Sequence, residues 1–224
     1  MRDARRSLIR KQIVRWFTAD SGPHGQETVA KKLARRYNVA SSKVVTVVRL
    51  KPYDKRRGLA RLRWGLVPCR ARSPNDGPRP INLRAESVAD KFGFLLRDKR
   101  CLIPADGFYE WKTVGKTKTP QRFTLATGGP FGFAGLWDVW GEGTANIVTC
   151  CLITTAANAL VRPVHDRMPV IVPPESYAEW LEPDTPADRL ATLLRPYPAD
   201  QMRVTAANWA VNSPKNDGPE LLAA

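Results

Sequence analysis

Long apolar runs are missing from this sequence, and no stretch approaches the roughly 20 residues that a membrane-spanning helix needs. Acidic residues are few: 21 Asp and Glu stand against 36 Lys and Arg, which gives a formal net charge of +15. The four cysteines form no C-x-x-C pair, so no metal site is expected. The N-terminus is charged but has no apolar stretch, which argues against a secretory signal. These absences favour a cytoplasmic protein with no membrane partner, no metal and no cofactor.

The excess of basic residues indicates an anionic partner. Nucleic acid is the usual partner for such a field. An anionic membrane surface is the rival, but the sequence has no basic amphipathic helix with a strong apolar face to lie on one. We therefore expect a DNA-binding protein that is associated with the nucleoid, and we expect it to be a monomer.

Short strands and helices alternate irregularly along residues 1–224, which are expected to form a single domain. Residues 1–36 are expected to form an N-terminal helical segment, with helices at 8–17 and 26–36. The lack of a regular β-α-β alternation predicts an α+β fold with a mixed or antiparallel, barrel-like β-sheet and flanking helices. Strands are expected at 43–50, 59–67, 100–110, 122–125, 131–139, 147–155, 168–172 and 204–211, helices at 85–96, 176–181 and 187–194, a short helix or loop at 158–162, and connections at 51–58, 73–80 and 112–120.

Two residues are candidates for proton transfer. His165 is one of only two histidines, and a neutral imidazole suits general acid–base chemistry near neutral pH. Glu110 ends an apolar strand between two aromatic residues, where loss of solvent raises the pKa of a carboxyl group. The alternatives are a structural histidine and a strand-end salt bridge.

Three more residues are candidates for binding. Asn82 and Arg84 follow the proline-rich loop, where an amide can hold a reacting oxygen and a guanidinium can hold a phosphate. Trp64 stands beside a cation and offers a flat surface for an unpaired base. The alternatives are that Asn82 and Glu86 cap or tether the following helix and that Trp64 packs in the core.

The cysteines are expected to be mostly small core residues. Cys150 and Cys151 are adjacent on an expected strand and should point to opposite faces of it. A cysteine peptidase that acts on other proteins is the weakest functional class, because nothing marks any of the four thiols as activated.

Six segments, taken together and in order, resemble the SRAP family (SOS response-associated peptidases, or abasic-site-processing proteins). The resemblance covers roughly residue 36 to the C-terminus and runs into Val211-Asn212. The matching segments are Arg36–Ala40, Arg63–Pro68, Ile81–Glu86, Arg100–Trp111, Ala134–Trp137 and His165–Pro169.

This resemblance implies a function and a set of catalytic residues. Family members bind single-stranded DNA that contains an abasic site, and an N-terminal cysteine closes a thiazolidine ring with the ring-opened sugar aldehyde. Self-processing peptidase and lyase activities accompany this crosslink. By match to the family motifs, Glu110 assists proton transfers, His165 promotes sugar-ring opening or strand-breaking elimination, and Asn82 positions the reacting group.

The resemblance also implies a DNA-binding set. Arg84 and Arg167 are expected to hold phosphates, and Trp64 and Asn38 complete the predicted contacts. The implied fold, a mixed α/β structure around a barrel-like sheet, agrees with the pattern of the sequence.

The N-terminus departs from the family pattern. Members begin Met-Cys-Gly-Arg, whereas Arg2 stands at the expected position of the cysteine here. An internal cysteine is no substitute, because amine and thiol must lie on one residue to close the ring. The open alternatives are an altered start, loss of the crosslink, or a weaker reaction in which the Met1 amine forms a Schiff base. A non-catalytic single-stranded DNA-binding protein that shields lesions is the alternative from another functional class.

Overall fold

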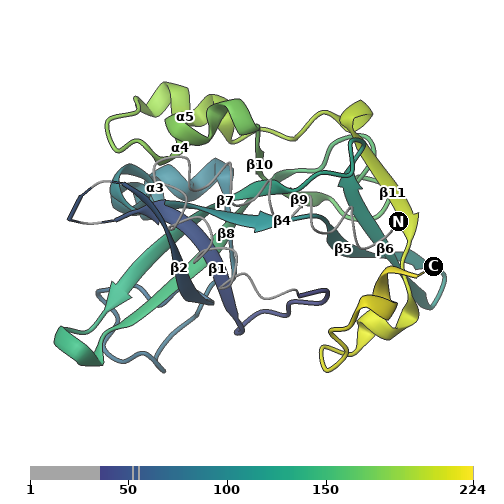
Figure 1. The fold of residues 1–224 in the computed structure, drawn as a ribbon, viewed down its shortest axis with the longest axis horizontal. Helices are drawn as coiled ribbons and strands as arrows, with labels where there is room; N and C mark the ends of the chain where they lie inside the picture. The colour runs from purple at the N-terminus through teal and green to yellow at the C-terminus, as the bar shows by residue number, and fades with distance from the viewer. Residues whose placement is uncertain (1–35, 52, 55, 224) are drawn as a thin grey trace, which may run out of the picture.

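The chain folds around two β-sheets, which Figure 1 shows with helices covering one side. The computed structural model describes residues 36–223 except 52 and 55. The larger sheet has eight strands: β1 Val44–Leu50, β2 Arg57–Trp64, β3 Asn82–Arg84, β4 Arg100–Ala105, β7 Phe131–Trp140, β8 Ile147–Ala156, β9 Arg167–Pro169 and β10 Ile171–Val172. The smaller sheet has three: β5 Phe108–Val114, β6 Thr117–Leu125 and β11 Met202–Ala206.

The larger sheet is strongly curled. Its strand order is β10-β7-β4-β1-β2-β8-β3, with β9 on β8, and β7 also pairs with β8. The pairings of β7, β4, β1, β2 and β8 therefore lead back to β7. Most are antiparallel, but β2 and β3 run parallel to β8, so the sheet is mixed. The expected α+β fold with a mixed, barrel-like sheet is confirmed.

Side chains alternate between two apolar clusters, one on each face of the larger sheet. Val48 and Cys151 pack on the face that carries the helices, whereas Val47 and Cys150 pack toward the smaller sheet. This alternation follows from the two-residue period of a strand. It confirms that the adjacent cysteines point to opposite faces. Both thiols and that of Cys101 are fully buried, and Cys69 is exposed.

Three α-helices cover one face of the larger sheet: α3 Ala85–Asp98, α4 Tyr177–Leu181 and α5 Ala187–Leu193. Helix α3 follows β3 without a connecting residue and buries Val88, Leu95 and Leu96. Short 3₁₀ turns complete the fold: η1 Gly143–Ala145, η2 Pro174–Ser176, η3 Ala199–Gln201, η4 Trp209–Asn212 and η5 Pro219–Leu222. Among the described residues, no helix is both long and apolar enough to cross a membrane.

The structure corrects four expected elements. The strand expected at 168–172 is two short strands, β9 and β10, which pair with β8 and β7 respectively. The strand expected at 100–110 is two strands in different sheets, β4 and β5, which separate at Asp106-Gly107. The basic connection expected at 112–120 is mostly strand, and its turn is only Gly115-Lys116. The strand expected at 204–211 ends at Ala206 and is followed by η4. The helices expected at 8–17 and 26–36 fall almost wholly outside the described residues, as does Arg2.

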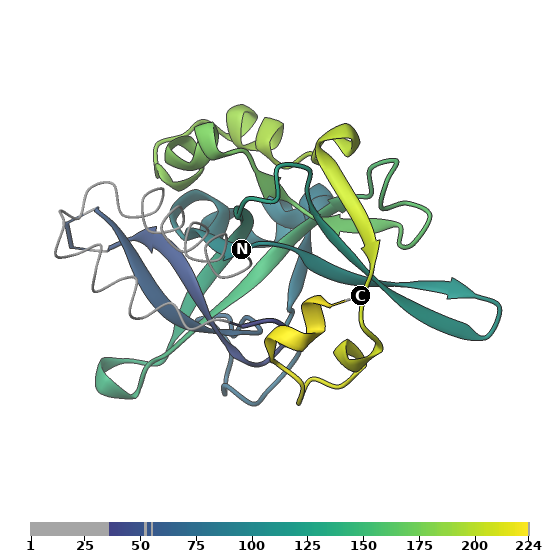
Figure 2. The same cartoon turned by 45° about the vertical axis from the view of Figure 1, so that its right-hand side comes forward.

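The hairpin made by β5 and β6 extends well beyond the body of the molecule (Figure 2). Val114 pairs with Thr117, which leaves a two-residue turn, and Gly115 there has a φ of +61°. Glycine adopts this conformation without the steric penalty that other residues meet, so it fixes the register of the hairpin.

Candidate active site

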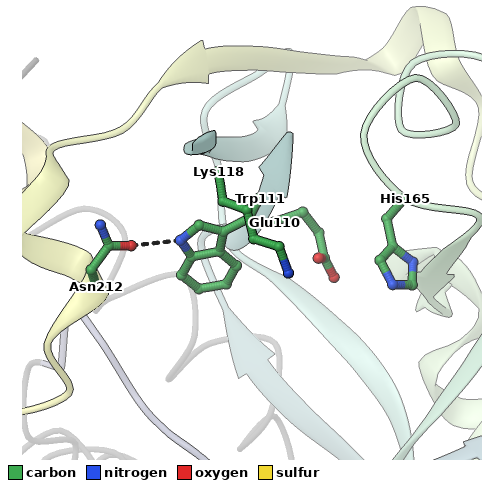
Figure 3. Close-up of a pocket in the computed structure, with 5 residues that line it drawn as sticks. All are labelled: Glu110, Trp111, Lys118, His165 and Asn212. Atoms are coloured by element: carbon green, nitrogen blue, oxygen red, sulfur yellow. Dashed lines mark hydrogen bonds between the residues drawn. The ribbon is translucent and has the colours of Figure 1, made fainter. Parts of the chain in front are cut away.

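One open pocket brings together residues from four separate parts of the chain. It has a volume of about 520 Å³. Strand β5 supplies Glu110 and Trp111, β6 supplies Lys118, the β8–β9 loop supplies His165 and η4 supplies Asn212 (Figure 3). Two of the expected catalytic residues, Glu110 and His165, therefore share one site.

Glu110 is half-buried at the middle of β5, opposite Gln121 of β6. Burial raises the pKa of its carboxyl group above the usual value, while the charge of a protonated His165 and the backbone N–H of Trp111 act in the opposite direction. A carboxylate with a raised pKa is a stronger base than an ordinary one, so Glu110 is suited to accept a proton.

His165 faces Glu110 across the pocket (Figure 3). Its Nδ1 accepts a hydrogen bond of 3.0 Å from the backbone N–H of Arg167. Nδ1 also lies 3.2 Å from the Arg167 carbonyl oxygen and 3.1 Å from a carboxylate oxygen of Asp166. Figure 3 shows the other ring nitrogen, Nε2, on the side nearer Glu110. When the imidazole is protonated, the pocket therefore presents an N–H donor and a carboxylate acceptor to one small volume.

The loop that carries His165 is held by Asn158, which is buried. Its Oδ1 accepts from the backbone N–H groups of Leu160 and Val161, and its Nδ2 donates to the Tyr197 carbonyl at 2.7 Å. The backbone N–H of His165 in turn donates to the Val161 carbonyl at 3.0 Å. Local hydrogen bonds thus fix the loop on which the imidazole stands.

The opposite wall of the pocket depends on Asn38. The Trp111 indole N–H donates to Asn212 Oδ1 at 2.6 Å (Figure 3). The buried side chain of Asn38 donates to the carbonyls of Val211 and Ser213, at 3.0 and 3.1 Å, on either side of Asn212. The amide N–H groups of Asn38 thus hold this wall, and its expected contact with DNA stays a prediction.

Asp217 anchors the segment that contains Asn38. Its carboxylate accepts from the backbone N–H groups of Tyr37 and Asn38, at 2.6 and 2.9 Å, and pairs with Arg36. Burial alone would raise the pKa of Asp217, but these three interactions together lower it below the usual value.

Asn82 and Arg84 stand on β3, at the edge of the larger sheet, and both are exposed. Strand β3 runs parallel to β8, with Asn82 opposite Leu152 and Arg84 opposite Thr154. Neither residue lines the pocket around Glu110. The exposed guanidinium of Arg84 remains suited to a phosphate.

Arg167 connects this edge to the pocket. Its guanidinium donates to both oxygens of Glu86, at 2.7 and 2.8 Å, and to the Thr154 carbonyl at 2.6 Å. The hydrogen bond from Arg167 is the main reason why the pKa of Glu86 is lowered. The phosphate contact expected of Arg167 would therefore compete with a paired carboxylate, whereas Glu86 has the tethering role expected at the start of α3.

Trp64 lies next to the β3 edge. Its indole N–H donates to the Ile81 carbonyl at 2.8 Å, immediately before Asn82. The side chain is half-buried and packs against the cluster that faces the smaller sheet. Trp64 therefore has the packing role that was one expectation, and its ring stays partly exposed, as the stacking of a base would require.

Three pocket residues were not among the sequence candidates: Trp111, Lys118 and Asn212. Trp111 ends the Arg100–Trp111 segment and Asn212 follows the last matching segment, so both lay within reach of the family pattern. Lys118 was not selected from the sequence, because residues 112–120 were expected to be a connection. Among the described residues, no group of three or more His, Cys, Asp or Glu side chains is arranged to hold a metal ion.

Comparison with known proteins identifies relatives over most of the chain. The family model described as "SOS response associated peptidase (SRAP)" matches residues 5–214, so the match begins well before residue 36. Abasic site processing protein YoqW of Bacillus subtilis is 45% identical over 191 residues, which cover 83% of this chain and 84% of that protein. Abasic site processing protein YedK of Escherichia coli is 30% identical over 220 residues, covering 96% and 92%.

A solved structure from Bacteroides thetaiotaomicron has a similar fold, with a TM-score of 0.76 at 25% sequence identity over 88% of each chain. Family model, relatives and fold agree with the six ordered segments. The chain therefore belongs to the SOS response-associated peptidase (SRAP) family.

Proposed function

We propose that this protein binds single-stranded DNA at abasic sites and acts on the sugar of the lesion. The observation that carries the proposal is the pair of Glu110 and His165, which face each other across one pocket (Figure 3). The names of the relatives, abasic site processing proteins, supply the substrate class. The net charge of +15 supports an anionic partner.

The pair is suited to open the sugar ring. An abasic deoxyribose is mostly a closed hemiacetal, and its aldehyde appears only when the C1′–O4′ bond breaks. Glu110 as the carboxylate accepts the proton of the C1′ hydroxyl, the C1′ carbonyl forms, and O4′ leaves with a proton from Nε2 of the protonated His165, which becomes neutral. The step needs one donor and one acceptor, which these two residues provide.

Binding and chemistry are assigned to adjoining surfaces. The exposed Arg84 on β3 holds a phosphate beside the pocket, and Asn82, two residues earlier on the same sheet edge, contacts the DNA strand outside the pocket. Arg167 joins this edge to His165, because its backbone N–H binds the imidazole and its side chain binds Glu86.

The experiment compares Glu110→Gln and His165→Asn with the unchanged protein on a single-stranded oligonucleotide with one abasic site. An oligonucleotide with a tetrahydrofuran analogue, which has no aldehyde, is the substrate control. Glu142→Gln is the matched variant, because Glu142 is exposed in the β7–β8 connection. Strand products are followed on denaturing gels and binding by fluorescence anisotropy.

We expect both pocket variants to bind the abasic strand but to lose product formation by about a hundredfold or more. Glu142→Gln should behave as the unchanged protein. If the unchanged protein forms no product and the pocket variants protect the lesion equally well, the protein is a non-catalytic single-stranded DNA-binding protein that shields lesions. Equal binding to abasic and intact strands would contradict the proposal.

A further inference from the structure

The pocket contains an amine that the proposed ring opening does not use. Lys118 is the second residue of β6 and lies opposite Thr113 of β5. It lines the same pocket as Glu110 and His165. Figure 3 shows its side chain passing the Trp111 indole, with its nitrogen on the side that faces Glu110.

Lys118 differs from Lys51 and Lys99, which are both held by a carboxylate. Lys51 pairs with Asp54, and Lys99 pairs with the buried Asp138 at 2.6 Å. Within the described part of the chain, no carboxylate forms such an ion pair with Lys118. Its exposed amine is therefore available to a ligand in the pocket.

The backbone that carries this lysine is an ordered hairpin. The hairpin register is continuous from Phe108–Phe123 to Val114–Thr117, and the tight turn at Gly115 closes it. Lys118 is two residues beyond that turn, next to the Trp111 ring that Asn212 holds through its indole N–H. The lysine is thus carried on an ordered strand rather than on a loose loop.

We propose that Lys118 is the amine that forms a Schiff base with the aldehyde of the ring-opened abasic sugar. This inference rests on the proposed function, because it needs the aldehyde which ring opening produces. Lysine amines commonly form such bonds with carbonyl substrates.

The step balances with groups that the pocket provides. The Glu110 carboxylate accepts a proton from the Lys118 ammonium, and the neutral amine adds to C1′, so that a C–N bond forms. A proton passes from the nitrogen to the former carbonyl oxygen, which becomes a hydroxyl. That hydroxyl takes the proton back from Glu110 and leaves as water, the C=N bond of the Schiff base forms, and Glu110 is again a carboxylate.

Two outcomes then follow for the Schiff base. Addition of water reverses the steps and releases the DNA. Alternatively Glu110 removes a proton from C2′, the C2′=C3′ double bond forms, and the C3′–O bond breaks with its electron pair going to the leaving phosphate. The second outcome cuts the strand on the 3′ side of the lesion.

The test is reductive trapping with borohydride on the abasic single-stranded oligonucleotide, followed by digestion and mapping of the modified peptide. Lys118→Arg keeps the positive charge but removes the primary amine. Lys112→Arg is the matched control, because Lys112 is exposed on the same hairpin and does not line the pocket. Thermal melting confirms that both variants are folded.

We expect the trapped adduct to map to Lys118, and Lys118→Arg to lower its yield by about tenfold or more while Lys112→Arg stays within about twofold. Binding to the abasic strand should be retained in both. An adduct at the Met1 amine or another lysine, undiminished trapping in Lys118→Arg, or no trapping at all would overturn the inference.

These failures are distinct from failure of the proposed function. If abasic strands are still preferred and still processed in a Glu110-dependent way without an adduct at Lys118, only the inference fails. If abasic and tetrahydrofuran strands are treated alike, the proposed function fails as well.

Discussion

Glu110 and His165 are held in the pocket by different means. Glu110 is fixed by its place in a paired strand and is half-buried. His165 stands on a loop, is about half exposed at 48% of its side chain, and depends on the Arg167 backbone N–H for its orientation. Burial therefore raises the pKa of the carboxyl group, whereas contacts of Nδ1 with Arg167 and Asp166 orient the imidazole.

This difference predicts a pH dependence that belongs to Glu110. Burial raises its pKa above the ordinary 4.5, so the carboxylate becomes protonated at a higher pH than an ordinary glutamate does when the pH is lowered. If Glu110 acts as the base, the rate rises as the pH increases through this raised pKa. Single-turnover rates on the abasic strand should therefore fall on the acid side at a pH above 4.5.

Glu110→Gln should remove this acid-side limb and lower the rate at neutral pH by about a hundredfold or more. Glu142→Gln should keep both the rate and the limb. An unchanged profile in Glu110→Gln would show that another group titrates.

Asn38 allows a second prediction at the scale of single residues. Asn38→Ala removes the two hydrogen bonds to the carbonyls that flank Asn212 and leaves buried polar groups unpaired. We expect a loss of about 1–3 kcal/mol in the free energy of unfolding, measured by urea denaturation. Asn75→Ala is the control, since Asn75 is exposed in the 73–80 loop, and should cost less than about 0.5 kcal/mol.

If Asn38 acts mainly through DNA contact, Asn38→Ala will weaken binding and leave the unfolding curve unchanged. That result would contradict the structural role of its side chain and support the contact that the sequence predicted.

Between β4 and β5, a single glycine allows the chain to pass from one sheet to the other. A Cβ atom at Gly107 would lie 2.8 Å from the backbone oxygen of Phe123, which belongs to β6. Backbone atoms give way less readily than side chains, so the close approach requires glycine. This change of sheet was not predicted from the sequence, because the residues from Arg100 to Glu110 form one apolar run that resembles a single strand.

Gly107→Ala should therefore destabilise the protein by about 1–3 kcal/mol through overpacking. Gly93→Ala is the matched control: Gly93 lies in α3 with no atom within 4 Å of the added Cβ, and alanine there should be neutral or stabilise by up to about 1 kcal/mol. The free energy of unfolding of both variants, measured by urea denaturation, tests this prediction. A neutral Gly107→Ala would mean that the hairpin shifts without cost.

Over the whole molecule, the charge predicts how binding responds to salt. Phosphate contacts release counterions, so the logarithm of the affinity for single-stranded DNA should fall linearly with the logarithm of salt concentration. Arg84→Gln should reduce the magnitude of that slope by about one. Arg189→Gln, at an α5 position paired with Glu179, should leave it unchanged. If the affinity of the unchanged protein for single-stranded DNA does not change with salt concentration, the basic surface serves another partner.

The sequence predicted the class of fold and much of the pocket for identifiable reasons. Helix α3 was predicted because its apolar residues recur at helical spacing, and β8 because its apolar run has the length of a buried strand. Glu110 and His165 were predicted because their residue types match their chemistry. Lys118 was missed because residues 112–120 were expected to be a connection rather than a hairpin, and Asn212 because the 3₁₀ turn that carries it reaches the pocket only through distant contacts.

The central position of β8 has a consequence for how the protein is made. This strand pairs with β2, β3, β7 and β9, and residues of three of these partners precede it in the chain. While the chain is being synthesised, β2 and β3 must wait for Ile147–Ala156 to leave the ribosome before their pairing is complete. The nascent chain therefore completes its larger sheet late, and its folding rate should be set by these distant pairings rather than by its helices.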